Sequence, residues 1–137
     1  MKPLPPQPRQ KSSLHRKVVG LLKNIYPNFT VLEEQSLPMW VDYGGGRRTT
    51  LFVDIIVKEL SLVIECHGRQ HFEFVPHFHQ TRHQFAQGVQ RDRAKAQRVM
   101  EAGYSYLVVR FDEESQLNER LLMNMILHCF GANYEPN

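Results

Sequence analysis

Two carboxylate side chains, Asp54 and Glu65, stand inside short segments whose other residues are nearly all apolar. A buried carboxylate without a partner costs several kcal/mol or shifts its pKa, and two that face each other repel. A divalent cation removes both penalties, and Mg²⁺ prefers carboxylate oxygens, backbone carbonyls and water as ligands. The pattern therefore predicts a cation site, with a pair of carboxylates neutralised by arginines as the structural alternative.

His67 follows Glu65 by two residues, so on a strand the two side chains project from the same face. A neutral imidazole at this place could orient or deprotonate a metal-bound water, and its protonated form could stabilise phosphate charge. The alternative is a histidine that ends a strand without a chemical role. Further along, Asp92 and Lys95 share one face of a predicted helix, where an intrahelical ion pair is the simplest explanation.

The segment from residue 67 to residue 83 is rich in histidine: His67, His71, His77, His79 and His83. Together with Cys66 they raise the hypothesis of a zinc-stabilised interaction module. The segment HGRQH, however, lacks the glutamate of an H-E-x-x-H helix, and the chain has no Cys-x-x-Cys pair. The interleaved phenylalanines suit contacts with DNA better, or else they form a small satellite core.

Two successive strands must position the carboxylates. Apolar and β-branched residues predict strands over residues 50–57 and 62–67, joined by a tight connection near residues 58–61. With two or four residues in that connection, Asp54 falls directly across from Glu65. A slip of one residue in this register would send the two side chains to opposite faces of the sheet.

The remaining elements follow from periodicity and from capping residues. Ser12 or Ser13 can cap a helix that runs to about residue 25, and a short strand is expected over residues 29–35. Residues 68–88 lack a regular pattern. A helix over residues 89–102 then ends at Gly103, and a strand covers residues 104–111. The last helix is expected over residues 113–130, with these side chains facing inward: Leu117, Leu121, Leu122, Met125, Ile126 and Cys129.

This order of elements predicts the fold class. A helix between the strands at 62–67 and 104–111 implies a crossover connection, and so at least one parallel pair of strands. The expected fold is α/β, with a central mixed β-sheet flanked by helices. Pro38 and the three glycines at residues 44–46 interrupt the pattern before the strand at 50–57, and the glycines form either a hairpin tip or a phosphate-contacting loop.

The length of 137 residues fits one domain, and 42% hydrophobic residues can fill one core. Residues 1–11 hold four prolines, so we expect a flexible basic arm before a domain over residues 12–137. Cys66 and Cys129 make no disulfide framework and suit reduced thiols in a cytosolic protein. No apolar run is long enough to span a membrane, and the N-terminal segment lacks the apolar core of a secretory signal.

Basic residues cluster in two stretches of the chain, although the net charge is only +3. Clusters of this kind suit a polyanion such as nucleic acid, and they also occur as ordinary solvated helix faces. The first stretch contains Arg9, Lys11, Arg16, Lys17 and Lys23, and the second contains Arg82, Arg91, Arg93, Lys95 and Arg98.

The segments VDIIVKELSLVIECHGRQHF and QRDRAKAQRVMEAGYSYLVVRF together resemble the PD-(D/E)xK endonuclease superfamily. They are most similar to the very-short-patch mismatch repair endonucleases, to related homing endonucleases and to small stand-alone nuclease-domain proteins of bacteria and phages. The resemblance spans residues 14–130 and implies a restriction-endonuclease-like core.

The resemblance also implies roles for individual residues. Asp54 and Glu65 match the metal-binding acids of the family, and the backbone carbonyl of Cys66 matches a further metal ligand. His67 occupies the position of the family's lysine, where the repair enzymes have a histidine. His71 resembles their second histidine, although it lies one residue before the direct match.

Asp92 and Lys95 match an acidic and basic pair in the helix that follows the strands, and Lys95 joins the expected catalytic set. The chain departs from the family in the first helix, which has no glutamate, so that Glu33 or Glu34 would have to substitute. The zinc-binding cysteines and the paired aromatic wedge of the repair enzymes are also absent. The residues expected to contact nucleic acid are Arg69, Gln70, Arg91, Asp92 and Lys95.

The function implied by the resemblance is a Mg²⁺-dependent DNA endonuclease that hydrolyses phosphodiester bonds, with Mn²⁺ as a substitute cation. Its partner would be DNA, a homodimer would supply specificity to so small a domain, and its compartment would be the cytosol of a bacterium or of a phage-infected host. The alternative is a nucleic-acid-binding or regulatory protein that keeps the fold without catalysis, because a histidine stands in the lysine position.

Overall fold

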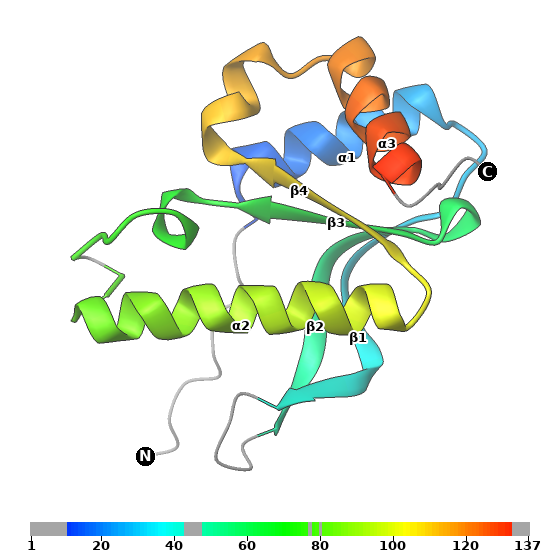
Figure 1. Ribbon diagram of the computed structural model, residues 1–137. Coiled ribbons are helices and arrows are strands. Elements are labelled where there is room, and N and C mark those ends of the chain that lie inside the picture. The colour runs from blue at the N-terminus through cyan, green and yellow to red at the C-terminus, as the bar shows by residue number, and fades with distance from the viewer. Residues whose placement is uncertain (1–10, 43–47, 77, 80, 133–137) are drawn as a thin grey trace, which may run out of the picture.

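A four-stranded sheet forms the centre of the molecule in the computed structural model, which describes residues 11–42, 48–76, 78–79 and 81–132. Its strands lie in the order β1 (Val31–Asp42), β2 (Arg48–Val57), β3 (Leu62–His67) and β4 (Ser105–Arg110). Helices α1 (Ser13–Ile25) and α3 (Glu119–Ala132) cover one face, and α2 (Arg82–Glu101) covers the other (Figure 1). The α/β fold class predicted from the sequence is thereby confirmed.

The sheet is mixed, as the expected crossover requires. Strand β2 runs antiparallel to both β1 and β3, whereas β3 and β4 are parallel. Parallel neighbouring strands cannot be joined by a tight turn, so the chain passes from β3 to β4 through α2. This helix lies on the face of the sheet opposite α1 and α3. This crossover places α2 beside the carboxyl end of β3.

Strand β1 is longer than the sequence predicts. It continues past residue 35 to Asp42 and absorbs Pro38 in a shift of register between Leu37 and Trp40. Proline has no N–H to donate, so an irregularity of this kind on an edge strand is where a sheet accepts one. The three glycines at residues 44–46, expected as a hairpin tip or phosphate loop, lie outside the described residues.

Two helix boundaries also differ from expectation. Helix α2 begins at Arg82 rather than at residue 89, after Thr81, whose side chain accepts a hydrogen bond from the Gln84 N–H at 3.1 Å. Residues 82–88 are mostly polar and exposed, so they show no apolar stripe. At its other end α2 stops before Gly103, whose φ of +97° confirms the predicted terminus.

The predicted last helix is divided into two elements. A 3₁₀ helix, η3 (Phe111–Gln116), comes first, and α3 follows after Leu117, whose backbone is extended. The side chain of Asn118 then accepts a hydrogen bond from the Leu121 N–H at 2.8 Å and so caps the start of α3. The expected inward face is confirmed, because Leu117, Leu122 and Ile126 are buried.

Apolar side chains fill both sides of the sheet, but unequally. The larger cluster lies between the sheet and the α1–α3 layer, and the smaller one between the sheet and α2. None of the helices formed by the described residues combines the length and the apolar character that crossing a bilayer requires. Lys11, expected in the arm, lies against the domain and forms an ion pair with Glu33.

Candidate active site

The two predicted carboxylates meet where strands β2 and β3 separate. The connection between these strands has four residues, because Val57 pairs with Leu62 and Ile55 with Ile64. Continuing this register sets Asp54 opposite Glu65, as the sequence predicts. The backbone pairing between β2 and β3 ends before this level, and hydrogen bonds from the two carboxylates replace it.

Each carboxylate accepts a hydrogen bond from the backbone of the opposite strand. Glu65 Oε2 accepts from the Asp54 N–H at 3.3 Å, and Asp54 Oδ2 accepts from the Cys66 N–H at 2.8 Å. The two side chains therefore converge in the gap between the strands. No arginine pairs with either acid among the described residues, so the structural alternative of an arginine-neutralised pair does not apply.

Strand β1 is also irregular where it passes Asp54. Glu33 pairs with Ile55 and Gln35 with Val53, so Glu34 lies beside Asp54, and its φ is +51°. A left-handed backbone is unfavourable for a residue with a Cβ, and such strain is typical of functional sites. Asp54 therefore lies between a strained residue of β1 on one side and the unpaired end of β3 on the other.

Glu65 is the most deeply buried acid of the site, with 2% of its surface exposed. Its Oε1 lies 2.5 Å from Nζ of Lys95, which reaches it from α2. Burial raises the pKa of Glu65 to about 8, and the nearby Asp54 adds to this effect, while Lys95 opposes it. One lysine therefore does not balance the two acids, and the site favours additional positive charge.

A second polar group lies between the end of β3 and α2. His71 Nδ1 is 2.8 Å from Asp92 Oδ2, and the rings of His67 and His71 stack with their centroids 4.0 Å apart. Burial, and then the neighbouring His71, lowers the pKa of His67 to about 4, so its ring is neutral at pH 7. The expected ion pair between Asp92 and Lys95 is wrong, because each contacts a residue outside the helix.

The tautomer of His71 follows from this contact. Burial opposes ionisation of Asp92, but the hydrogen bond and the charge of His71 hold the pKa of this carboxyl below its usual value. Asp92 is therefore an acceptor, and His71 Nδ1–H donates to it. In the neutral ring the lone pair then lies on Nε2, which is the nitrogen left to exchange a proton.

Two clefts meet at the short 3₁₀ helix η2 (Arg69–His71), where Gln70 and His71 line both. The cleft on the α1 side has a volume of about 250 Å³ and exposes Asp54, and the cleft on the α2 side has about 300 Å³. The α2-side cleft is also lined by His79, Gly88, Arg91, Asp92 and Lys95. Asp54 thus lines one cleft, Asp92 and Lys95 line the other, and Gln70 and His71 border both.

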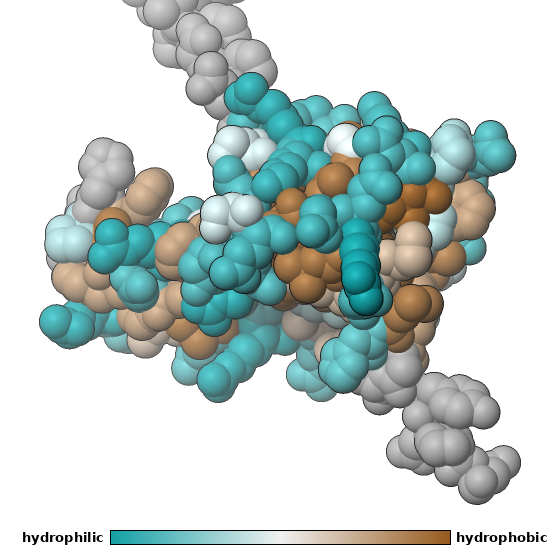
Figure 2. All heavy atoms as spheres, turned by 90° about the horizontal axis from the view of Figure 1, so that it is seen from above, coloured by the Kyte–Doolittle hydropathy of each residue, from teal (hydrophilic) through white to brown (hydrophobic). Residues whose placement is uncertain are grey.

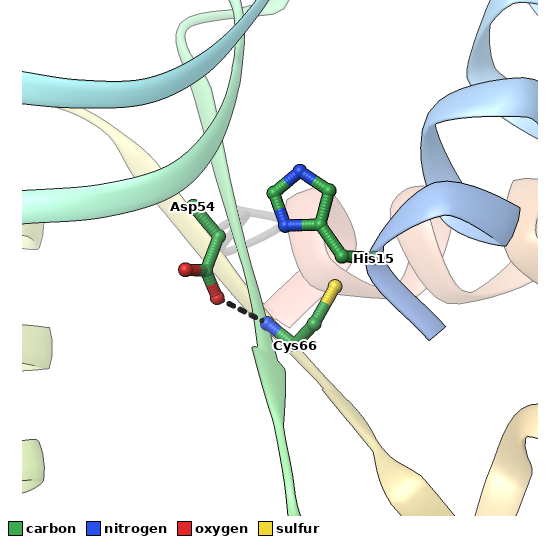
Figure 3. A group of neighbouring side chains, drawn as sticks. All are labelled: His15, Asp54 and Cys66. Atoms are coloured by element: carbon green, nitrogen blue, oxygen red, sulfur yellow. Dashed lines mark hydrogen bonds between the residues drawn. The ribbon is translucent and has the colours of Figure 1, made fainter. Parts of the chain in front are cut away.

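His15, which the sequence analysis did not single out, lies beside Asp54. It comes from α1 and is only 4% exposed, and Nε2 of its ring is 3.0 Å from Glu33 Oε1. Figure 3 shows its ring directed toward Asp54 and Cys66. Its position in the sequence could have indicated burial, because helical spacing places His15 on the same face of α1 as the apolar residues Val18 and Leu22.

Cys66 presents two different groups to the site. Its N–H donates to Asp54, and its sulfur faces α1, near His15 (Figure 3). Potential ligand atoms of His15, Asp54 and Cys66 all lie within 4.8 Å of one another. The zinc hypothesis joined Cys66 with the histidines of residues 67–83, but among the described residues Cys66 groups with His15 instead. Two histidines of that segment, His67 and His71, form a separate group of potential ligands with Asp92, and His77 lies outside the described residues.

Among the residues expected to contact nucleic acid, Arg69 stands apart. Its Nε lies 2.6 Å from Glu73 Oε2, and it lines neither of the two clefts. Gln70, Arg91, Asp92 and Lys95 all line the α2-side cleft, and Asp92 is also hydrogen-bonded to His71.

Tyr106 of β4 was also missed by the sequence analysis. Its hydroxyl is buried and has no hydrogen-bond partner among the described residues. Tyr106 pairs with Val63 and packs against the cluster beneath α2, so it lies on the α2 side of the sheet. Burial raises the pKa of Tyr106, and the charges of Glu65, Asp92 and Asp54 raise it further.

No protein-family model matches the sequence, and no curated protein matches it. What the chain does must therefore follow from the site.

Proposed function

We propose that the protein is a metal-dependent nuclease that hydrolyses phosphodiester bonds in DNA. The observation that carries the proposal is the convergence of Asp54 and Glu65 where β2 and β3 separate. Two acids placed together in a largely buried gap cost free energy unless positive charge joins them.

The donor set fits a divalent cation. Asp54 opens onto the α1-side cleft, and burial raises the pKa of Glu65 to about 8 although Lys95 opposes the rise. These two carboxylates would hold the ion, together with the backbone carbonyl of Cys66 implied by the family resemblance. Such an ion, when bound, polarises a phosphate and lowers the pKa of water.

The remaining chemistry belongs to side chains of this protein. His71 is held by Asp92 through Nδ1 and lines both clefts, so Nε2 can take a proton from an attacking water or return one to a leaving oxygen. The neutral, buried His67 keeps this ring in place by stacking. His71 is therefore better placed than His67 to move the proton.

Binding of DNA is supported by the charge and the shape of the α2 side. Arg91 and Lys95 line a cleft next to the acids, where cationic groups can contact phosphates. The N-terminal half of α2 and the segment before it project from the body of the molecule, with hydrophobic and hydrophilic residues side by side (Figures 1 and 2). There Arg82 lies over the ring of Phe74 at 4.9 Å.

The test is a cleavage assay on single-stranded, duplex, mismatched and branched DNA, with Mg²⁺, with Mn²⁺ and with a chelator. Asp54→Asn and Glu65→Gln keep the shape of each side chain and should lower cleavage by orders of magnitude while DNA binding remains. Asp112→Asn, at an exposed acid paired with Arg110, is the matched control and should cut normally.

Two outcomes would contradict the proposal. Asp54→Asn that cuts as fast as the parent protein would exclude this site. Salt-sensitive DNA binding without cleavage under any cation condition would support the non-catalytic alternative instead.

A further inference from the structure

The side of Asp54 that faces α1 holds a nitrogen donor that the proposed carboxylate site does not use. His15 is almost completely buried, and its ring points between Asp54 and Cys66 (Figure 3). Ligand atoms of these three residues lie within 4.8 Å of one another. A buried imidazole this close to a functional acid needs an explanation, because burying a polar ring without satisfying both nitrogens is unfavourable.

One nitrogen of this ring is already engaged. His15 Nε2 lies 3.0 Å from Glu33 Oε1, and Lys11 Nζ donates to the same oxygen at 3.0 Å. Lys11 keeps Glu33 a carboxylate, which can only accept, so His15 Nε2 carries a hydrogen. In the neutral ring the lone pair then lies on Nδ1. Nδ1 is the nitrogen on the side of Asp54 and Cys66 in Figure 3.

This is the arrangement found around histidines that bind metals. The ring nitrogen away from the ion donates to a carboxylate, which fixes the tautomer and the orientation of the ring and makes the other nitrogen a better ligand. Here Glu33 of β1 has that role, and the cap made by Ser12, whose hydroxyl accepts from the His15 N–H at 3.1 Å, fixes the backbone of His15 at the start of α1.

We propose that His15 Nδ1 is a ligand of the cation held at Asp54, and that the site consequently takes Mn²⁺, Co²⁺ or Zn²⁺ in preference to Mg²⁺. Imidazole nitrogen suits Zn²⁺ and Co²⁺ best. Mn²⁺ binds nitrogen more weakly than these two ions but accepts it more readily than Mg²⁺, which prefers oxygen. The sulfur of Cys66, in the same group, strengthens this preference. The inference rests on the proposed function, because the cation is the one assigned to Asp54 there.

The test measures cation binding to the full chain after removal of metals, by titration calorimetry with Mn²⁺ and with Mg²⁺. The variant His15→Phe keeps an aromatic ring and removes both nitrogens. It should weaken Mn²⁺ binding by about tenfold or more and change Mg²⁺ binding by less than about threefold. The matched control His128→Ala, at an exposed histidine of α3, should change neither affinity.

A second measurement does not depend on how the buried variant folds. Pulsed electron paramagnetic resonance of the Mn²⁺-loaded parent protein should show coupling to an imidazole nitrogen. Glu33→Gln, which leaves His15 in place and removes its carboxylate partner, should also weaken Mn²⁺ binding by about tenfold.

The failures of the two proposals are distinguishable. An unchanged ratio of Mn²⁺ to Mg²⁺ affinity in His15→Phe, or no nitrogen coupling in the parent protein, would overturn the role of His15. If Asp54→Asn still abolished cation binding in that case, the proposed nuclease site would stand. A parent protein that bound neither cation would overturn both.

Discussion

The two faces of the sheet bury different kinds of side chain. Toward α1 and α3 the sheet contributes Ile55, Val57, Leu62 and Ile64 to a cluster of apolar residues, with His15 at its margin. Toward α2 the apolar cluster is smaller, and buried or half-buried charges accompany it: Glu65, Asp92 and Lys95.

This difference separates stability from chemistry. Apolar burial stabilises a fold by about 25 cal/mol for each Å² removed from water, whereas a buried ion pair contributes little or is unfavourable. The α1–α3 face therefore contributes most to stability, and the α2 face carries the buried polar groups on which the proposed function rests. Substitutions on the two faces should affect different measurements.

The largest expected effect belongs to the α2 face and is seen in activity. Glu65→Gln removes a carboxylate that would hold the cation without changing the shape of the side chain, so cleavage of DNA should fall by orders of magnitude while the fold persists. The measurement is a single-turnover cleavage rate beside a circular-dichroism spectrum. If Glu65→Gln cleaved DNA at the parental rate, the assignment of activity to the α2 face would be wrong.

On the α1–α3 face the corresponding effect is on stability. Leu122→Ala leaves a cavity in the larger cluster and should lower the free energy of unfolding by about 2–5 kcal/mol in urea titrations. The control Leu127→Ala, on the same helix but 60% exposed, should cost much less. Equal losses from both variants would contradict the assignment of the core, and the cleavage rate per folded molecule should not change in either.

The pH dependence of stability should come from Glu65. Its pKa lies near 8 in the folded protein against 4.5 as the ordinary value, so between these two values the folded state holds more protons than the unfolded chain. Without cations, the free energy of unfolding should therefore fall as the pH rises from about 5 to 8, by a few kcal/mol. Urea titrations with a chelator measure this slope.

Two variants identify the source of that slope. Glu65→Gln should flatten it, and Glu119→Gln, at an exposed acid of α3, should leave it unchanged. A parent protein whose stability rose with pH over this range would show that Glu65 ionises easily in the folded state.

The smallest expected effect tests the buried hydroxyl of Tyr106. Because it has no partner among the described residues, Tyr106→Phe should raise the free energy of unfolding, by about 1 kcal/mol. Thermal unfolding compared with Tyr104→Phe, at a partly exposed tyrosine of the same cluster, would measure it. A clear loss of stability would mean that the hydroxyl is hydrogen-bonded.

Local sequence patterns predicted the part of the site that depends on neighbouring strands. The alternation of side chains and the length of the connection at residues 58–61 were enough to place Asp54 opposite Glu65. The parallel pairing of β3 and β4 followed from the helix between them. These features involve residues close together in the chain, and few alternatives compete with them.

Contacts between distant elements could not be predicted in the same way. Asp92 and Lys95 suit an intrahelical pair, and only the packing of α2 on the sheet directs them to His71 and Glu65. His15 lies far from Asp54 in sequence, and nothing local indicates that α1 covers that end of β2. The start of α2 was missed because residues 82–88 project from the molecule and need no apolar stripe.

The hydrogen bonds that replace backbone pairing at the end of β2 and β3 bear on how related sequences should be interpreted. Selection for a stable fold alone would keep a side chain that accepts from the Cys66 N–H at position 54 and one that accepts from the Asp54 N–H at position 65. Asparagine and glutamine satisfy that demand as well as the acids do. If the proposed nuclease activity were lost in a related protein, amides at these two positions could record the loss while the architecture endured.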